Sequence, residues 1–463
     1  MSTEQLMLPY TIHELAPALQ GTPHHVDPQT KVSGLTTDSR KIQPGQWFVC
    51  LQGENSDGHS YAAQAIAHGA AGLIASAEHL PAELQQAPRI EVASPNQALL
   101  DWATDYRKRF SGNVLGITGS NGKTTTKEIA RHLCQSLDAT AHATQGNYNN
   151  FIGVPLTLLS APLDTSWWVV EIGTNHFGEI ETLAKVSRPT VGLLTSIGES
   201  HLEFLLNTAG VAREKSGLWK GLVEDCQAWI PANVLERSVL EREAEQIGVV
   251  LYSFGLNEPA AEWNLQLQAT RSDNGLLILD SPIGELQTSL NNPLALQNLA
   301  GVLAALDSTG VDDSDLRQAV AELDLDVAGR MQLLPRGDIL WVNDSYNANP
   351  SSFRSVLQSL RQMYPSRRLL LAAGSMAELG DQAPELHHQV GVFAAECGVS
   401  TLFACGPYGL NLAEGWQATT QRLVHVAEEP GDLLPLLQRT LQPNDVILVK
   451  GSRSARMERI LPE

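Results

Sequence analysis

The sequence predicts an α/β protein that folds as three domains built mainly on parallel sheets. The chain has 463 residues, and a typical domain size of about 150 residues makes three the expected number of domains. Short apolar runs rich in β-branched residues alternate with helical patterns along most of the chain, which is typical of βαβ units. Hydrophobic residues make up 43% and charged residues 18%, so the composition indicates a globular protein.

The first predicted domain, residues 1–110, is a small α/β unit. Three runs with strand character are separated by helical stretches, at 47–51, 72–76 and 89–92. A helix at 96–109 follows them, and the Ser-Gly-Asn sequence directly after it breaks the helical pattern. Because such clusters mark loops, we expect the first domain boundary there.

The second predicted domain, residues 111–325, contains a central parallel sheet. Its strands are expected at 113–118, 167–173, 190–198 and 228–233. Three short antiparallel strands and a buried helix rich in Ala and Leu are expected to complete the domain, at 263–270, 276–280, 285–290 and 297–306. Since the first four runs are apolar and alternate with helical patterns, they favour a parallel sheet built from βαβ units.

The third predicted domain, residues 326–463, shows the same alternation and predicts a Rossmann-type module. Its strands are expected at 339–344, 368–374, 401–406 and 445–451, with helices between them. Ligands of such open parallel sheets bind at the carboxyl ends of the strands. Polar residues that follow these strands are therefore candidates for a site.

The charge and the cysteines exclude several classes of protein. The formal net charge is −20, which repels nucleic acids and anionic lipids because both are bound through neutralised phosphates. Five widely spaced cysteines without a CxxC motif predict neither a disulfide framework nor a thiolate zinc site. The first residues lack a basic segment before an apolar core, and the uncharged stretch 139–163 holds several Asn and Gln. We therefore expect a cytoplasmic protein without membrane insertion.

Residues 114–128, VLGITGSNGKTTTKE, predict a phosphate-binding loop between a strand and a helix. Gly119 and Gly122 free backbone N–H groups to face phosphate oxygens, Lys123 adds a positive charge, and Thr124 offers a hydroxyl to Mg²⁺. The expected ATP contacts are Gly119, Ser120, Asn121, Gly122, Lys123, Thr124 and Thr125. The strict Walker spacing fails at Ile117, and a glycine turn without a ligand is the alternative. The coincidence of strand, turn, Lys-Thr and helix favours the phosphate loop.

The form TGSNGKTTT resembles the Mur ligase family, the ATP-dependent amide ligases of peptidoglycan precursor synthesis. Further motifs follow in the family's order over nearly the whole chain: TTDSR at 36–40, GNYNNFIGVPLTLL at 146–159, EIG at 171–173, SIGESHLEF at 196–204, AREKSGL at 212–218, GR at 329–330, DSYNANP at 344–350 and KGSR at 450–453. Chance does not readily supply such a series. The resemblance implies two Mg²⁺ ions and an ATP-driven ligation.

The resemblance implies a metal site of four residues. Glu171 ends the apolar run WWVVE and would hold Mg²⁺ against the nucleotide phosphates, together with Thr124. His201 would hold the second Mg²⁺. Lys215 would carry CO₂ as a carbamate that binds this second ion; many relatives read KAK where this chain has REK, so only Lys215 matches. The alternatives are a hydrated acid at a strand end, a packed histidine and an ordinary lysine.

The resemblance places the UDP end of the substrate on the N-terminal motif. Hydroxyl, carboxylate and guanidinium groups of Thr37, Asp38, Ser39 and Arg40 suit uracil, ribose and diphosphate. In the middle domain, Asn147 and Asn150 of the GNYNN loop, with Asn149 between them, would contact sugar or carboxylate groups. Ordinary turn chemistry is the alternative for both segments.

The segment DSYNANP resembles the members of the family that append D-alanyl-D-alanine. It follows the predicted strand at 339–344, so its side chains are expected to face a cleft between domains. Asp344 would hold the ATP ribose, Asn347 and Asn349 would contact ATP or the amino acceptor, and Arg330 would reach the γ phosphate.

One departure from the family concerns the adenine. The family's His-xxx-Asn pattern reads Leu294 to Asn298 here, so the asparagine matches and the histidine does not. We expect Asn298 to contact ATP and apolar packing to hold more of the adenine.

The predicted function is an ATP-dependent amide ligase that joins UDP-N-acetylmuramoyl-tripeptide to D-alanyl-D-alanine through an acyl phosphate. Its expected catalytic residues are Lys123, Lys215, His201 and Arg330, in a protein expected to be a monomer. Another ligase of the superfamily, of the folyl-polyglutamate or cyanophycin type, is one alternative. A phosphate-loop binding or switch protein is the other.

Overall fold

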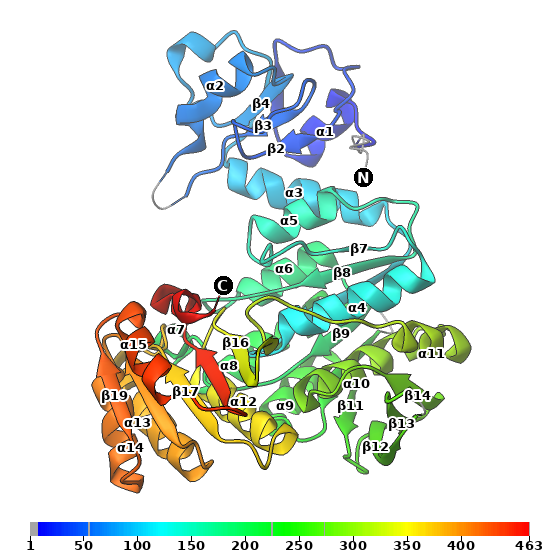
Figure 1. Cartoon of the computed structure of the whole chain (residues 1–463). Coiled ribbons are helices and arrows are strands. Elements are labelled where there is room, and N and C mark those ends of the chain that lie inside the picture. Colours follow the sequence, from blue (N-terminus) through cyan, green and yellow to red (C-terminus); the bar gives the residue numbers. More distant parts are fainter. Residues whose placement is uncertain (1–7, 54–55, 224–225, 273, 463) are drawn as a thin grey trace.

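The computed structural model describes residues 8–53, 56–223, 226–272 and 274–462. These residues form three sheets with helices between and around them, of five, nine and six strands. In Figure 1 the first sheet (blue) lies at one end of the molecule, and the second (cyan to green) and third (yellow to red) lie beside each other at the other end. The α/β architecture with three sheets is confirmed.

The first sheet has the order β1-β5-β4-β3-β2. Its strands are β1 (Thr22–His24), β2 (Leu35–Thr36), β3 (Trp47–Val49), β4 (Gly72–Ala75) and β5 (Arg89–Glu91). Its helices are α1 (Ile12–Ala18), η1 (Gly58–Tyr61), α2 (Ala62–Ala67), η2 (Ala82–Leu84) and α3 (Pro95–Lys108). The three predicted strands are confirmed. Strands β1 and β2 were not predicted, because they lie at the two edges and are too short to show an alternation of apolar and polar residues.

Helix α3 joins the first sheet to the rest of the molecule, because it packs on α5 and α6 of the second unit. The buried guanidinium of Arg107 donates to the carbonyl oxygens of Ser187, Arg188 and Phe110, at 2.8, 2.9 and 2.9 Å. The ring of Phe110 stacks on that of Trp168, with centroids 3.9 Å apart. These contacts hold the first sheet firmly to the second.

The second sheet has the order β14-β13-β12-β11-β10-β9-β6-β8-β7. Its strands are β6 (Asn113–Thr118), β7 (His142–Ala143), β8 (Trp167–Glu171), β9 (Val191–Leu194), β10 (Gln227–Pro231), β11 (Leu251–Leu256), β12 (Trp263–Arg271), β13 (Leu277–Ser281) and β14 (Gly284–Thr288). Strands β12, β13 and β14 pair with one another in the antiparallel sense, as predicted. Strand β12 also pairs in parallel with β11, which was not predicted. The predicted strand at 190–198 is too long, because the chain leaves the sheet after Leu194.

Helices cover this sheet on both faces. They are α4 (Lys123–Leu137), α5 (Gly153–Leu159), α6 (Glu179–Ser187), α7 (Leu202–Leu205), α8 (Thr208–Ser216), η3 (Trp219–Gly221), α9 (Arg237–Ile247), α10 (Pro293–Asp307) and α11 (Asp313–Ala321). The predicted buried helix is α10, which begins four residues early because Asn292 caps its first turn and Pro293 follows at the first helical position. The stretch 139–163 forms β7, α5 and loops; within the described part of the chain, no helix has both the length and the apolarity that a bilayer crossing requires.

The third sheet has the order β15-β16-β20-β17-β18-β19. Its strands are β15 (Gln332–Arg336), β16 (Ile339–Asp344), β17 (Leu369–Ala373), β18 (Thr401–Cys405), β19 (Val424–Ala427) and β20 (Val446–Lys450). Its helices are α12 (Pro350–Met363), η4 (Gly380–Gln382), α13 (Ala383–Glu396), α14 (Gly409–Thr419), α15 (Pro430–Thr440), η5 (Arg453–Ala455) and η6 (Met457–Ile460). All pairs but β15–β16 are parallel. The four predicted strands are confirmed.

Candidate active site

The predicted phosphate loop has the expected backbone. Strand β6 is buried and ends at Thr118, and helix α4 begins at Lys123. Gly119 and Gly122 adopt φ angles of +152° and +85°, and a Cβ atom on Gly119 would collide with the side chain of Thr195. Only glycine meets both requirements at Gly119. The strand, turn and helix therefore present a loop whose backbone can surround an anion.

The ammonium group of Lys123 is turned back over this loop. Its Nζ donates a 2.6 Å hydrogen bond to the carbonyl oxygen of Gly119. Burial lowers the pKa of Lys123 to about 8; the carboxylate of Glu171 raises this pKa and the guanidinium of Arg330 lowers it. The cation thus lies where both a second cation and a carboxylate act on it.

Glu171 lies at the end of β8, opposite the phosphate loop. Its Oε1 accepts hydrogen bonds from Nδ2 of Asn149 at 2.8 Å and from Oγ1 of Thr124 at 3.3 Å. Its Oε2 is buried and has no hydrogen-bond partner among the described residues. A buried carboxylate oxygen of this kind, beside a threonine hydroxyl, fits a divalent cation.

Lys215 is a fully buried lysine on α8. Burial and the nearby charge of Lys123 hold its pKa well below the usual value. The preceding acid does not neutralise it directly, since Glu214 accepts hydrogen bonds from the backbone N–H groups of Gly178 (2.6 Å) and Ile180 (2.8 Å). No ion pair of Lys215 occurs within the described residues, so the environment favours a neutral amine.

His201 of the second unit contacts an acid of the third unit. It adopts a left-handed φ of 53°, and its Nδ1 lies 2.5 Å from Oε2 of Glu378, which belongs to the third unit. Burial lowers the pKa of His201 and the contact with Glu378 raises it. Within the described ranges, no three His, Cys, Asp or Glu side chains converge as a ready metal cluster.

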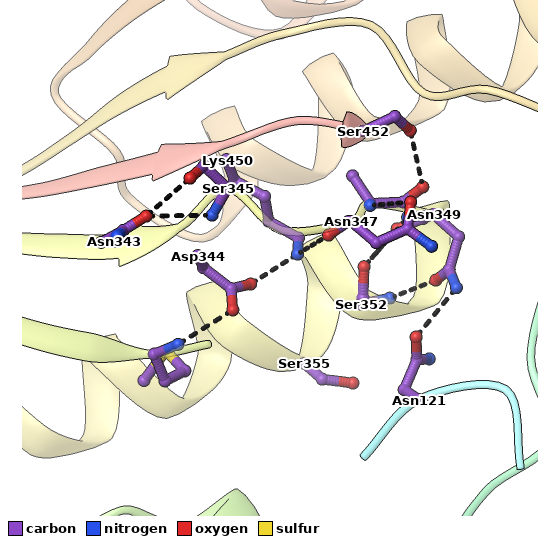
Figure 2. A network of polar contacts seen from close by, with 12 residues as sticks. Asn121, Asn343, Asp344, Ser345, Asn347, Asn349, Ser352, Ser355, Lys450 and Ser452 are labelled. Carbon is purple, nitrogen blue, oxygen red and sulfur yellow. Dashed lines mark hydrogen bonds and ion pairs between the residues drawn. The ribbon is translucent and has the colours of Figure 1, made fainter. Parts of the chain in front are cut away.

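The segment DSYNANP lies at the carboxyl end of β16, and hydrogen bonds join it to other parts of the third unit (Figure 2). Asp344 accepts from the backbone N of Met331 at 2.9 Å and from Nζ of Lys450 at 2.5 Å. Lys450 also donates to the carbonyl oxygen of Asn347 at 3.1 Å. Both carboxylate oxygens of Asp344 are thus engaged within the protein, and its predicted contact with ribose stays a prediction.

The same segment meets the phosphate loop directly (Figure 2). Asn349 caps helix α12, and its Nδ2 donates a 2.8 Å hydrogen bond to Oδ1 of Asn121. Nδ2 of Asn121 in turn donates to Oγ of Ser351 at 2.9 Å. An ion pair between Glu199 and Arg354 lies on the same side of the contact between the two units.

A cavity of about 990 Å³ lies between the second and third sheets. The phosphate loop, Asn298, Arg330 and Asp344 line it, and the guanidinium of Arg330 stacks over the ring of Tyr346 at 4.3 Å. Its volume is of the size that nucleotide-binding pockets have. An apolar part of its wall is formed by Leu290, Leu294, Leu325, Val327 and Met331.

The predicted UDP residues are not part of this cavity. Arg40 is 78% exposed and pairs with Asp38, Nε to Oδ1 at 2.8 Å. Hydrogen bonds from the side chain and the backbone N–H of Arg40 lower the pKa of Asp38 to about 2. Ser39 is buried and donates to Oε1 of Gln64 at 2.9 Å. The residues Thr37, Asp38, Ser39 and Arg40 follow strand β2 of the first sheet.

The two predicted substrate contacts of the GNYNN loop, Asn147 and Asn150, differ in their surroundings. Asn147 is exposed. Oδ1 of Asn150 accepts from the backbone N of Ile152 (3.1 Å) and Gly153 (2.9 Å) and so starts helix α5. These two bonds of Asn150 are ordinary turn chemistry, which is the alternative to substrate binding for this loop. The contact of Asn147 and Asn150 with substrate stays a prediction.

The sequence analysis missed three residues that the structure brings to this site: Glu378, Lys450 and Arg354. Lys450 offered a signal, since it ends a buried apolar run in the quoted KGSR motif. Glu378 and Arg354 carried none, because an acid in a polar loop and an arginine on a helix are commonplace.

The fold and the site define a phosphate-loop nucleotide enzyme that acts between two domains. The sequence matches the "Mur ligase family, catalytic domain" over residues 31–107, the "Mur ligase middle domain" over 117–306 and the "Mur ligase, glutamate ligase domain" over 329–453. The chain belongs to the Mur ligase family. It is therefore an ATP-dependent ligase that forms amide bonds.

Three known proteins illustrate the similarity. The chain is 32% identical to the UDP-N-acetylmuramoyl-tripeptide–D-alanyl-D-alanine ligase of Escherichia coli, covering 98% of both chains. The crystal structure of MurF from Acinetobacter baumannii superposes with a TM-score of 0.87 at 28% identity, covering 98% of both chains. MurF of Thermotoga maritima in complex with ADP gives a TM-score of 0.78 at 26% identity, covering 92% of this chain and 95% of that one.

Proposed function

We propose that this ligase joins UDP-N-acetylmuramoyl-tripeptide to D-alanyl-D-alanine and cleaves ATP to ADP and phosphate. The observation that carries the proposal is the direct contact between the phosphate loop and the segment DSYNANP, through Asn121 and Asn349. This contact brings an ATP-binding element and the segment that resembles D-alanyl-D-alanine ligases to one cleft. The names of the full-length relatives support the same activity.

The reaction needs an activated carboxylate, because a free carboxylate is a poor acyl donor. The γ phosphoryl group moves to the terminal carboxylate of the tripeptide, and the amine of the dipeptide then displaces phosphate from the acyl phosphate. Lys123 and Arg330 lie on the wall of the large cavity, where they stabilise the negative charge of the transferring group. Contact between the two units keeps water away from the acyl phosphate.

Two Mg²⁺ ions fit the proposed site, one at Thr124 and Glu171 and one at His201 and Lys215. Ions held by these residues would supply positive charge to the phosphates. The buried Oε2 of Glu171, which has no hydrogen-bond partner in the described part of the chain, supports this assignment. Carbamylation of Lys215 adds CO₂ to a neutral amine and releases one proton, which converts a buried amine into an oxygen ligand. The low pKa of Lys215 supports this step, since only the unprotonated amine reacts with CO₂.

The remaining contacts belong to the two substrate ends. Thr37, Asp38, Ser39 and Arg40 of domain 1–110 bind the UDP group, and Asn147 and Asn150 contact the sugar or the peptide. ATP binds between domains 111–325 and 326–463, with Asn298 and Asp344 on the nucleoside and Asn347 and Asn349 near the acceptor. The monomeric state expected from the sequence stays a prediction.

Phosphate release is the experiment that separates this function from its alternatives. Purified protein receives ATP, Mg²⁺ and UDP-N-acetylmuramoyl-tripeptide, and then D-alanyl-D-alanine, glutamate or another amino acid in turn. We expect fast phosphate release only with D-alanyl-D-alanine. Release with glutamate on a folate substrate would favour the folyl-polyglutamate type, and acceptor-independent slow release would favour a switch protein.

A further inference from the structure

A second, smaller cavity of about 280 Å³ adjoins the nucleotide cleft. Ser120, Lys123, Asn347 and Asn349 line both cavities. The phosphate loop and the DSYNANP segment therefore form the wall between them.

The small cavity lies at the carboxyl ends of three adjacent strands, β16, β20 and β17. The loops that follow these strands are bonded to one another. The backbone N of Ala377 donates to Oγ of Ser452 at 2.9 Å, and this hydroxyl donates to the carbonyl oxygen of Ala348 at 3.2 Å. These bonds connect the three loops, and the cavity lies at the edge where parallel sheets hold their ligands.

The lining of this cavity carries charged side chains of both signs. Among the described residues that line it, Glu378 is the only acid, and Lys123 and Arg453 are the only lysine and arginine. Lys123 already serves the phosphate loop. Glu378 and Arg453 remain, with the hydroxyls of Ser452 and Ser454 beside them, so the cavity offers one negative and one positive group to a small ligand.

The carboxylate of Glu378 is held in place from both sides of the cleft. Glu378 adopts a left-handed φ of 61°. This backbone conformation costs energy for any residue with a Cβ atom and persists where the surroundings enforce it. The backbone N of Glu203 donates to its carbonyl oxygen at 3.2 Å, and its Oε2 lies 2.5 Å from Nδ1 of His201. The side chain stays 42% exposed, so the carboxylate is oriented but still accessible.

The guanidinium of Arg453 is available to a ligand. Its side chain is 71% exposed and pairs with Oε1 of Glu458 at 3.2 Å. An exposed ion pair of this kind stabilises a protein by about 0–1 kcal/mol. A carboxylate of a ligand in the cavity can therefore replace Glu458 as the partner of Arg453.

We infer that the small cavity binds the acceptor dipeptide as a zwitterion, with its ammonium group on Glu378 and its carboxylate on Arg453. This inference rests on the proposed function and adds the residues that recognise the acceptor. Ammonium and carboxylate are the two charges at the ends of a free dipeptide, and the cavity has one complement for each. Ala348 and Ala377 also line it, and their small side chains leave room for methyl groups of alanine. Through Ser120 and Lys123, the cavity opens toward the phosphate that the amine must displace.

The experiment measures steady-state KM values for acceptor, ATP and UDP-tripeptide in four variants. They are Glu378→Gln, Arg453→Gln, Arg453→Lys and the control Arg459→Gln, which alters an exposed arginine that does not line the cavity. Each variant is tested with D-alanyl-D-alanine and with its C-terminal amide, which lacks the carboxylate. Wild-type protein is tested first, because failure with every acceptor would refute the proposed function itself.

Glu378→Gln is expected to raise the KM of both acceptors about tenfold or more, since both carry the ammonium group. Arg453→Gln is expected to raise the KM of the dipeptide by a similar factor and to leave that of the amide unchanged. Arg453→Lys should lie between Arg453→Gln and wild type, and Arg459→Gln should match wild type.

Two results would overturn the inference while ligation itself persists. Equal effects of Arg453→Gln on dipeptide and amide would show that Arg453 does not read the carboxylate. A change confined to the KM of ATP or to the Mg²⁺ requirement in Glu378→Gln would mean that this acid serves the metal site or only joins the two units. Arg453 is exposed, so its variants keep the inference testable even if Glu378→Gln fails to fold.

Discussion

Nδ2 of Asn349, at the start of helix α12, donates a 2.8 Å hydrogen bond to Oδ1 of Asn121, at the tip of the phosphate loop. The two residues belong to different sheets and lie 228 positions apart in the sequence. The backbone N of Asn121 also donates to Oγ of Ser196 at 2.9 Å. One loop residue thus joins the phosphate-binding backbone to the third unit of the molecule.

Asn121→Ala removes both side-chain bonds across this contact, and we expect it to open the nucleotide cleft. The radius of gyration measured by small-angle X-ray scattering without nucleotide should rise, because the contacts that remain include partly exposed ion pairs, such as Glu199 with Arg354 and His201 with Glu378, which hold the two units weakly. Ser355→Ala is the matched control, since Ser355 donates within its own helix, to the carbonyl oxygen of Ser351. Identical scattering of wild type and Asn121→Ala would show that the bond does not hold the two units together.

Lys123→Ala is expected to abolish ligation and to keep the fold. Its one hydrogen bond within the described residues goes to the loop carbonyl of Gly119, so its loss removes phosphate charge rather than core packing. Circular dichroism and the melting temperature should match wild type, and Lys185→Ala, which alters an exposed helix pair, should stay active. Activity within tenfold of wild type, about 1.4 kcal/mol of barrier, would refute the role of the phosphate loop.

ATP affinity should fall as the pH rises above about 8. The pKa of Lys123 is about 8 without ligand, so below this pH the ammonium is protonated and attracts phosphate, and above it binding requires uptake of a proton. The Kd of ATP, measured by calorimetry, should rise by up to about tenfold per pH unit in that range. Lys123→Arg keeps its charge and should lack this slope. A flat Kd in the wild type would contradict the expected titration.

Lys215→Ala is expected to be inactive and to regain part of its activity with added acetate or propionate. A short carboxylate can enter the space of the buried side chain and supply the oxygen that the carbamate provides. Wild type freed of CO₂ should likewise lose activity and recover it with bicarbonate. Lys215→Arg is the control, because it fills the space and cannot form a carbamate. Full activity of Lys215→Ala without any additive would make Lys215 an ordinary lysine.

The two ends of the active site should respond to different variants. Arg40→Ala should raise the KM of the UDP substrate without a measurable loss of stability, since Arg40 is 78% exposed. Asp344→Asn and Asn347→Ala should weaken the use of ATP or D-alanyl-D-alanine. Asp344→Asn should also lower the melting temperature, because it leaves the buried ammonium of Lys450 without its carboxylate. The reverse pattern of KM values would mean that the UDP substrate binds near Asp344 and Asn347 and that ATP or the acceptor binds near Arg40.

The route through an acyl phosphate can be tested with heavy oxygen in the terminal carboxylate of the UDP-tripeptide. One labelled oxygen should leave in inorganic phosphate, with ADP as the nucleotide product. Lys123, Glu171 and Arg330 support this outcome, because their charges act on one another around the phosphate loop. Label in AMP would instead indicate an acyl adenylate.

Much of the fold could be predicted because the elements concerned have strong local patterns. Strand β6 is found at the predicted residues, since its central residues are apolar and buried and a glycine lies directly before and after it. Strands β1, β2, β7, β15 and β19 were missed; they are short or exposed edge strands, whose pairing depends on neighbours rather than on their own residues. Strand β11 was also missed although it lies inside the second sheet, because three of its six residues are only partly buried and its apolar pattern is weak. The phosphate loop was predictable for a similar reason, because its glycines, lysine and threonines are contiguous.

The sequence by itself determined the parts of the site that lie within one segment: the loop that ends at Lys123, the acid at the end of β8 and the capped start of α12. The tertiary structure alone decided which of these parts meet. Residues 344, 377 and 452 converge because β16, β20 and β17 are neighbours in the third sheet, and His201 meets Glu378 because two separate units come into contact. Strand order and domain contact depend on long-range packing, and no local pattern of residues encodes that packing.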